Sequence, residues 1–176
     1  MTGATLLQPG FPAERVPVEQ GQIQYGTDPR TLVTILGSCV AVCLWDHVRH
    51  LGGMNHFVLP SDPRGGNNAR YGYPAIDELV AGLLRLGCRI GDLQAKVFGG
   101  AAVLPSSGGE SVGSTNVRIA LERLRHYGIP VTAQRTGGTL GQQIRFDTAT
   151  GAVCFRLLRR STQNTEPADP RRTIVS

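Results

Sequence analysis

Aromatic residues are scarce in this 176-residue chain, at 6% of the sequence, and Cys-x-x-Cys pairs and nucleotide-binding glycine motifs are absent. The shortage of aromatics predicts a core built mainly from Val, Leu, Ile and Ala. Without a Cys-x-x-Cys pair, the four cysteines give no indication of a zinc or dithiol redox site. Because neither Gly-x-x-x-x-Gly-Lys-[Ser/Thr] nor Gly-x-Gly-x-x-Gly occurs, we expect no nucleotide site. We therefore expect a protein with no metal and no cofactor.

Long apolar runs are also missing. No window approaches the roughly 18 apolar residues that a membrane span requires, and the N-terminal residues lack the features of a signal peptide. We expect a cytoplasmic protein that does not insert into a membrane and keeps its thiols reduced. The net charge of +5 is spread over the chain and is not interleaved with aromatics. This pattern favours a solvated surface over a nucleic-acid interface.

The length and the 40% hydrophobic content fit one domain with a single core. We expect a flexible leader over 1–16, a folded domain over 17–160 and a disordered tail over 161–176. Short β-rich apolar runs predict strands, and helical spacing of apolar residues after Pro74 and around Val117 predicts two helices. The sequence thus predicts a mixed α/β sandwich with two main helices. Strands are expected near 17–25, 31–36, 40–45, 53–59, 93–98, 129–135, 142–147 and 152–158.

A Gly37-Ser38-Cys39 turn precedes the buried strand expected at 40–45. A cysteine there has a rigid support, and the N–H groups of the turn can bind an oxyanion. The base that such a thiol needs is expected to be His56. If the hairpin loop is centred between Val48 and Arg49, Ala41 faces His56 and Cys39 faces Val58, so Cys39 and His56 share one face of the ribbon.

A one-residue slip of this register would move His56 to the other face. The structural alternative is that Cys39 is a small core residue and His56 a satisfied polar group, as we expect for the other three cysteines.

Several segments together resemble the CheD family of chemoreceptor glutamine deamidases. They are LGSCVAVCLWD at 36–46, GGMNHFVLP at 52–60, RYG at 70–72, AKVFGGA at 95–101, Gly-x-x-Asn at 113–116, TGG at 136–138 and RFD-T-x-x-G at 145–151. The resemblance extends from about Thr31 to Leu158. It implies an α/β sandwich related to the catalytic domains of glutamine-deamidating toxins.

The resemblance also implies roles for individual residues. Cys39 would be the nucleophile and His56 its base. A threonine upstream of the cysteine would orient the histidine, with Thr34 preferred over Thr31. We expect Ser38, Gly99 and Gly100 to contact the substrate, although a strand-ending turn is an equal explanation for the two glycines.

The implied activity converts glutamines of methyl-accepting chemotaxis receptors to glutamate through a cysteine thioester. The receptors' cytoplasmic domains would be the partners, with a CheC-type phosphatase as a second partner. Two alternatives stay open at this point: a non-catalytic regulator of such a phosphatase, and a cysteine peptidase or amidase acting on cell-wall peptides.

Overall fold

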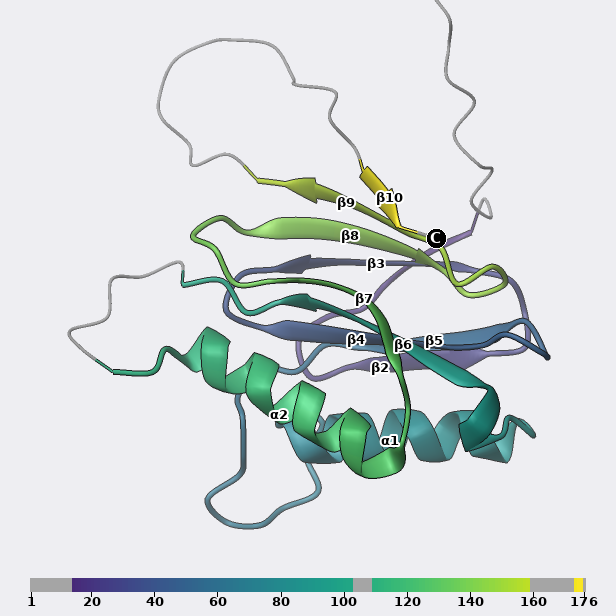
Figure 1. The fold of residues 1–176 in the computed structure, drawn as a ribbon, viewed down its shortest axis with the longest axis horizontal. Coiled ribbons are helices and arrows are strands. Elements are labelled where there is room, and N and C mark those ends of the chain that lie inside the picture. The colour runs from purple at the N-terminus through teal and green to yellow at the C-terminus, as the bar shows by residue number, and fades with distance from the viewer. Residues whose placement is uncertain (1–13, 103–108, 159–172, 176) are drawn as a thin grey trace, which may run out of the picture.

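The computed structural model describes residues 14–102, 109–158 and 173–175. Two five-stranded sheets are stacked, and two helices cover the far face of one of them, which gives three layers (Figure 1). The sheet that the helices cover is the middle layer, and we call it the central sheet. We call the second sheet, on the side away from the helices, the outer sheet. The expected mixed α/β sandwich with two main helices is therefore confirmed.

The central sheet has the strand order β2-β5-β4-β6-β7. Its strands are β2 (Ile23–Gly26), β5 (Leu51–Asn55), β4 (Val40–Asp46), β6 (Leu93–Gly99) and β7 (Val131–Thr136). The helices are α1 (Gly72–Arg85) and α2 (Val112–Tyr127), with a short 3₁₀ turn at Ile90–Asp92. α1 connects β5 to β6, which run in the same direction because both are antiparallel to β4. α2 connects β6 to β7, which pair in parallel.

The outer sheet has the strand order β1-β3-β8-β9-β10. Its strands are β1 (Arg15–Pro17), β3 (Thr31–Leu36), β8 (Gln142–Asp147), β9 (Val153–Leu157) and β10 (Thr173–Val175). Only β1 and β3 pair in parallel, and all other neighbours are antiparallel.

β4 is buried on both faces, which explains its uninterrupted apolar run. Val40, Val42 and Leu44 pack against the helices, whereas Ala41 and Cys43 pack against the outer sheet. The alternation follows from the two-residue period of a strand. The molecule therefore has two apolar layers, one between the sheets and one under the helices.

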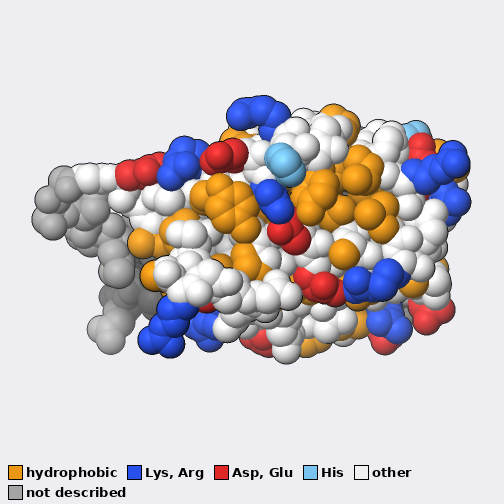
Figure 2. All heavy atoms as spheres, turned by 90° about the horizontal axis from the view of Figure 1, so that it is seen from below, with side chains coloured by type: hydrophobic (Ala, Val, Ile, Leu, Met, Phe, Trp, Pro, Cys, Tyr) orange, Lys and Arg blue, Asp and Glu red, His pale blue; other side chains and the backbone are white. Residues whose placement is uncertain are grey.

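Both helices end at a glycine with a positive φ angle. Gly87 follows the α1 cap residue with φ +89°, and Gly128 caps α2 in the left-handed conformation with φ +71°. At its start, α2 is capped by Ser111, whose side chain accepts a hydrogen bond from the N–H of Ser114. Apolar side chains gather in patches on the outer face of the helix layer, with charged side chains between and around them (Figure 2).

The strands expected at 31–36 and 142–147 have those same bounds in the structure. The strand expected at 53–59 is wrong beyond Asn55: residues 56–59 leave the regular ladder and keep only isolated bridges to Val40 and Tyr71. The leader expected over 1–16 already forms strand β1 from Arg15, and residues 1–13 lie outside the described residues.

The tail expected to be disordered over 161–176 contains strand β10, which pairs with β9. Residues 161–172 and 176 lie outside the described residues. Within the described part of the chain, neither helix has the length and apolarity needed to cross a bilayer.

Candidate functional site

The register between β4 and the segment after β5 brings the two candidate catalytic residues onto one face. Val40 pairs with Phe57, and Cys43 pairs with Met54. Both pairs belong to the same register, which sets Ala41 opposite His56. The predicted register is therefore confirmed. Cys39 and Met54 belong to the core between the sheets, and His56 lies two residues beyond Met54, so both site side chains face the outer sheet.

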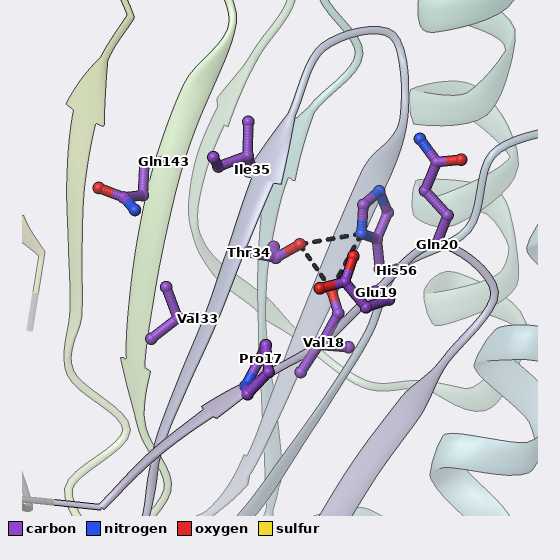
Figure 3. Close-up of a pocket in the computed structure, with 9 residues that line it drawn as sticks. All are labelled: Pro17, Val18, Glu19, Gln20, Val33, Thr34, Ile35, His56 and Gln143. Carbon is purple, nitrogen blue, oxygen red and sulfur yellow. Dashed lines mark hydrogen bonds between the residues drawn. The ribbon is translucent and has the colours of Figure 1, made fainter.

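Thr34 reaches the site from β3 of the outer sheet. Its Oγ1 lies 2.9 Å from His56 Nδ1 and 2.7 Å from the carbonyl oxygen of Val18. Nδ1 is also 3.2 Å from that same carbonyl. All three residues contribute to one network in Figure 3. Thr31, the other candidate, lies at the far end of β3, opposite Asp147.

This network selects one tautomer of His56. The Val18 carbonyl can only accept, so the Thr34 hydroxyl donates its proton to it. The Thr34 oxygen then accepts from Nδ1–H of His56. Nε2 consequently carries the lone pair, which is the state that a general base requires.

Nε2 of His56 is buried and has no hydrogen-bond partner among the described residues. In Figure 3 this nitrogen points away from Thr34 and Val18, toward the turn that connects β3 to β4. Burial lowers the pKa of His56, while the Val18 carbonyl and the Glu19 carboxylate act in the opposite direction. His56 is therefore a neutral imidazole at neutral pH, with its basic nitrogen free.

Cys39 is almost covered, with 7% of its surface exposed. Burial raises the pKa of its thiol; its own backbone N–H and the positive charge of Arg70 partly offset this. The resting pair is thus a neutral thiol and a neutral imidazole. A thiolate would then have to form by proton transfer to a nearby base.

A cavity of about 530 Å³ opens over the imidazole. It is lined by Thr34 and His56 together with Pro17, Val18, Glu19, Gln20, Val33, Ile35 and Gln143. Ile35 is 58% exposed, although it is a large apolar residue. Cys39 is not part of this lining. A substrate in this cavity would lie against His56 and Thr34.

The remaining cysteines have no such surroundings. Cys43, Cys88 and Cys154 are buried and free. Burial strongly raises the pKa of Cys43, and burial together with Asp46 raises the pKa of Cys88 to about 12. This agrees with the expectation that they are structural.

Ser38, Gly99 and Gly100 all lie at the turn that carries Cys39. Ser38 is half-buried, while both glycines are buried. An added Cβ on Gly99 would lie 2.1 Å from the Cys39 carbonyl oxygen, and one on Gly100 would lie 2.3 Å from Val117 Cγ2. The space that an added Cβ would need is occupied by the Cys39 backbone at Gly99, and by the Val117 side chain and the Gly113 carbonyl at Gly100.

Four contributors to the site were not identified from the sequence: the Val18 carbonyl, Glu19, Arg70 and Asn116. The Val18 carbonyl and Glu19 reach the site only through folding, and no local pattern marks them. Arg70 was visible as the first residue of the RYG segment, which had no assigned role. Asn116 was visible as the last residue of the Gly-x-x-Asn motif, but the motif had no assigned role. Its side chain donates to the carbonyls of Ser38 and Val58, on both sides of Cys39.

The fold and the site together define a three-layer α/β sandwich with a candidate cysteine–histidine–threonine centre between its sheets. The family model described as CheD chemotactic sensory transduction matches residues 58–157. The chain belongs to the CheD family.

Curated relatives extend the match. A protein of Rhodospirillum rubrum named probable chemoreceptor glutamine deamidase CheD is 54% identical over 140 residues, which is 79% of this chain and 80% of that one. A protein of the same name from Caulobacter sp. is 39% identical over 98% of this chain and 91% of its own. One from Anaeromyxobacter dehalogenans, named probable chemoreceptor glutamine deamidase CheD 1, is 43% identical over 82% and 85%.

Among solved structures, the chain is similar to the Bacillus licheniformis hypothetical protein YfiH. The TM-score is 0.42 at 16% identity, over 64% of this chain and 51% of that one. A likeness this distant carries no functional weight. The expected relation to deamidating toxin domains stays a prediction.

Proposed function

We propose that this chain is a protein-glutamine deamidase that acts on chemoreceptors, with Cys39 as nucleophile, His56 as general base and Thr34 as the residue that orients His56. The single observation that carries the proposal is the free Nε2 of His56, held in its basic tautomer by Thr34 on the face that Cys39 shares. The names of the curated relatives supply the substrate class.

The reaction begins with proton transfer from the Cys39 thiol to His56 Nε2. The sulfur attacks the side-chain carbonyl carbon of a glutamine, a carbon–sulfur bond forms, and the carbonyl oxygen becomes an oxyanion. Imidazolium then gives its proton to the amide nitrogen, because an unprotonated amide nitrogen is too basic to leave. The carbon–nitrogen bond breaks and ammonia departs.

The thioester is opened by water. His56, neutral again, takes a proton from the water as its oxygen attacks the same carbon. The carbon–sulfur bond breaks, the thiolate recovers the proton from His56, and glutamate is released. Thr34 supports both steps, because its bond to Nδ1 keeps Nε2 aimed at the reacting atoms while the ring gains and loses charge.

The cytoplasm is the proposed location, since a reduced cysteine is required for this chemistry. The cytoplasmic domains of methyl-accepting receptors are the proposed substrates, and a CheC-type phosphatase is a further proposed partner. The alternative of a purely regulatory, non-catalytic partner is not favoured, because the relatives are named as deamidases.

The test is mass spectrometry of a receptor cytoplasmic fragment after incubation with the full chain. We expect selected glutamines to become glutamates, with ammonia released in equal amount. Cys39→Ala and His56→Ala should abolish both signals. Cys43→Ala is the matched control, because it removes a thiol from the same face of β4 and should leave the conversion intact. Undiminished conversion by Cys39→Ala would refute the mechanism.

A further inference from the structure

The turn that carries Cys39 has three consecutive carbonyl groups, and each of them accepts a hydrogen bond. The carbonyl of Gly37 accepts from the N–H of Ala101 at 2.8 Å, and that of Cys39 accepts from the N–H of Gly100 at 2.8 Å. Between them, the carbonyl of Ser38 accepts from Asn116 Nδ2 at 3.0 Å. Each of these three peptide planes is therefore held by a hydrogen bond.

Asn116 is the side chain in this arrangement. It is fully buried in α2, and the same Nδ2 also donates to the carbonyl of Val58 at 2.9 Å. Val58 is the residue opposite Cys39 in the hairpin register. Asn116 thus joins the start of β4 to the segment after β5, on the helix side of the central sheet, directly beneath the nucleophile.

The glycine of the same Gly-x-x-Asn motif, Gly113, lies against the two residues whose N–H groups hold the Gly37 and Cys39 carbonyls. A Cβ on Gly113 would lie 2.5 Å from the carbonyl oxygen of Gly100 and 2.9 Å from that of Ala101. Only a glycine lets the first turn of α2 press against these two residues, whose N–H groups hold Cys39 and Gly37. Gly113 and Asn116, the two ends of the motif, therefore both support the turn that carries Cys39.

Holding the carbonyls fixes the N–H groups. In a trans peptide the C=O and the following N–H point in opposite directions. With the Gly37 carbonyl held by Ala101 and the Ser38 carbonyl held by Asn116, the N–H of Ser38 points away from Ala101 and the N–H of Cys39 points away from Asn116. Within the described part of the chain, neither N–H donates to any other residue.

The backbone N–H of Cys39 also lowers the pKa of its own thiol, against the larger raising effect of burial. Backbone donors beside a nucleophilic sulfur can stabilise an oxyanion in the transition state.

We propose that Asn116, with Gly113, is a positioning residue that orients the N–H groups of Ser38 and Cys39 as the oxyanion donors of this site. The inference rests on the proposed deamidase function and deepens it. It assigns the Gly-x-x-Asn motif a task in catalysis, although neither residue touches the substrate.

Comparing two reactions of Cys39 distinguishes a role of Asn116 in orienting oxyanion donors from a purely structural role. Deamidation passes through an oxyanion, whereas alkylation of the thiol by iodoacetamide does not. In Asn116→Ala we expect kcat for a receptor fragment to fall by about 10- to 1,000-fold. KM and the rate of Cys39 alkylation at each pH should stay at the wild-type values. Gly113→Ala should show the same split.

Gln142→Ala is the matched control. Gln142 is also buried, and its amide donates to a backbone carbonyl, that of Arg135, at 3.0 Å. It should lose stability and keep its kcat. Wild-type kcat in a folded Asn116→Ala, a parallel loss of deamidation and alkylation, or an equal loss of kcat in Gln142→Ala would each overturn the inference. Absence of deamidation in the wild type would instead overturn the proposed function.

If Asn116→Ala and Gly113→Ala both fail to fold, an NMR experiment on the wild-type chain tests the inference instead. A peptide whose glutamine amide is replaced by an aldehyde adds the Cys39 thiol to form a hemithioacetal, whose oxygen mimics the oxyanion. The amide proton resonances of Ser38 and Cys39 should then move strongly downfield in the NMR spectrum. Unmoved resonances in the adduct would overturn the inference.

Discussion

Thr34 and His56 are hydrogen-bonded at 2.9 Å, although Thr34 belongs to the outer sheet and His56 follows a strand of the central sheet. The bond crosses the apolar layer at its edge, beside the cavity. Its hydroxyl proton goes to Val18, so the threonine oxygen is an acceptor for the imidazole. Through this one contact, the packing of two sheets determines which nitrogen of the base is free.

Thr34→Val should therefore impair catalysis more than folding. Valine has a similar shape but cannot accept from Nδ1–H, so His56 loses its preferred tautomer and ring orientation. We expect kcat to fall by at least about tenfold, and Thr34→Ser to restore most of it. Steady-state kinetics of both variants on a receptor fragment will show this. Equal kcat values for the wild type and Thr34→Val would rule out the orienting role.

The ionisation of Cys39 gives a second prediction. Because burial raises the pKa of this thiol above that of an ordinary cysteine, its thiolate fraction is small at neutral pH and grows in alkaline solution. The rate of Cys39 alkylation by iodoacetamide should follow the same rise, measured by peptide mapping to separate the four cysteines. A rate that is already constant around neutral pH would mean a preformed thiolate–imidazolium pair, contrary to the neutral pair inferred here.

Glu19 should influence the pH below which activity is lost, because it affects the pKa of His56. Its carboxylate raises the pKa of His56 against the larger, lowering effect of burial. Glu19→Gln removes that effect, so the pKa of His56 falls further and the ring stays neutral to a lower pH. The acidic limb of the kcat/KM profile should move to lower pH, and Glu19→Asp should move it less. A shift to higher pH would contradict this assignment.

Gly53 in the Gly-Gly-Met-Asn-His segment should be essential for packing. An added Cβ would lie 2.7 Å from Tyr25 Cβ, 2.8 Å from the Gln24 carbonyl oxygen and 2.8 Å from Leu79 Cδ1, so both β2 and α1 would have to move. We expect Gly53→Ala to destabilise the fold by about 1–3 kcal/mol, measured by chemical denaturation. Gly91→Ala, where nothing lies within 4 Å of the added atom, is the matched control.

The shared face of Cys39 and His56 could be predicted from the sequence because it depends on local rules. A short polar loop between two apolar runs fixes the hairpin register, and the two-residue period of strands then decides the faces. Val40 pairs with Phe57 as that reasoning requires. The prediction held even though the regular ladder ends at Asn55, because the isolated bridge preserves the register.

Contacts between layers could not be predicted in the same way. Thr34 was preferred to Thr31 only through the family resemblance, and its contact with His56 depends on how the outer sheet stacks on the central one. Asn116 is similar, because its acceptors lie 78 and 58 residues away in the chain. The strand at Thr173–Val175 escaped notice because it is three residues long and depends on pairing with β9.

The core between the sheets is closed by apolar contacts on one side of the candidate site and by the Thr34–His56 bond on the other. If Cys39 and His56 carry out the proposed reaction, turnover depends on this polar contact between the two sheets. A slight separation of the layers would free the imidazole to rotate and silence the chemistry well before helices or strands melt. Loss of turnover on gentle heating or in mild denaturant should accordingly precede the loss of secondary structure.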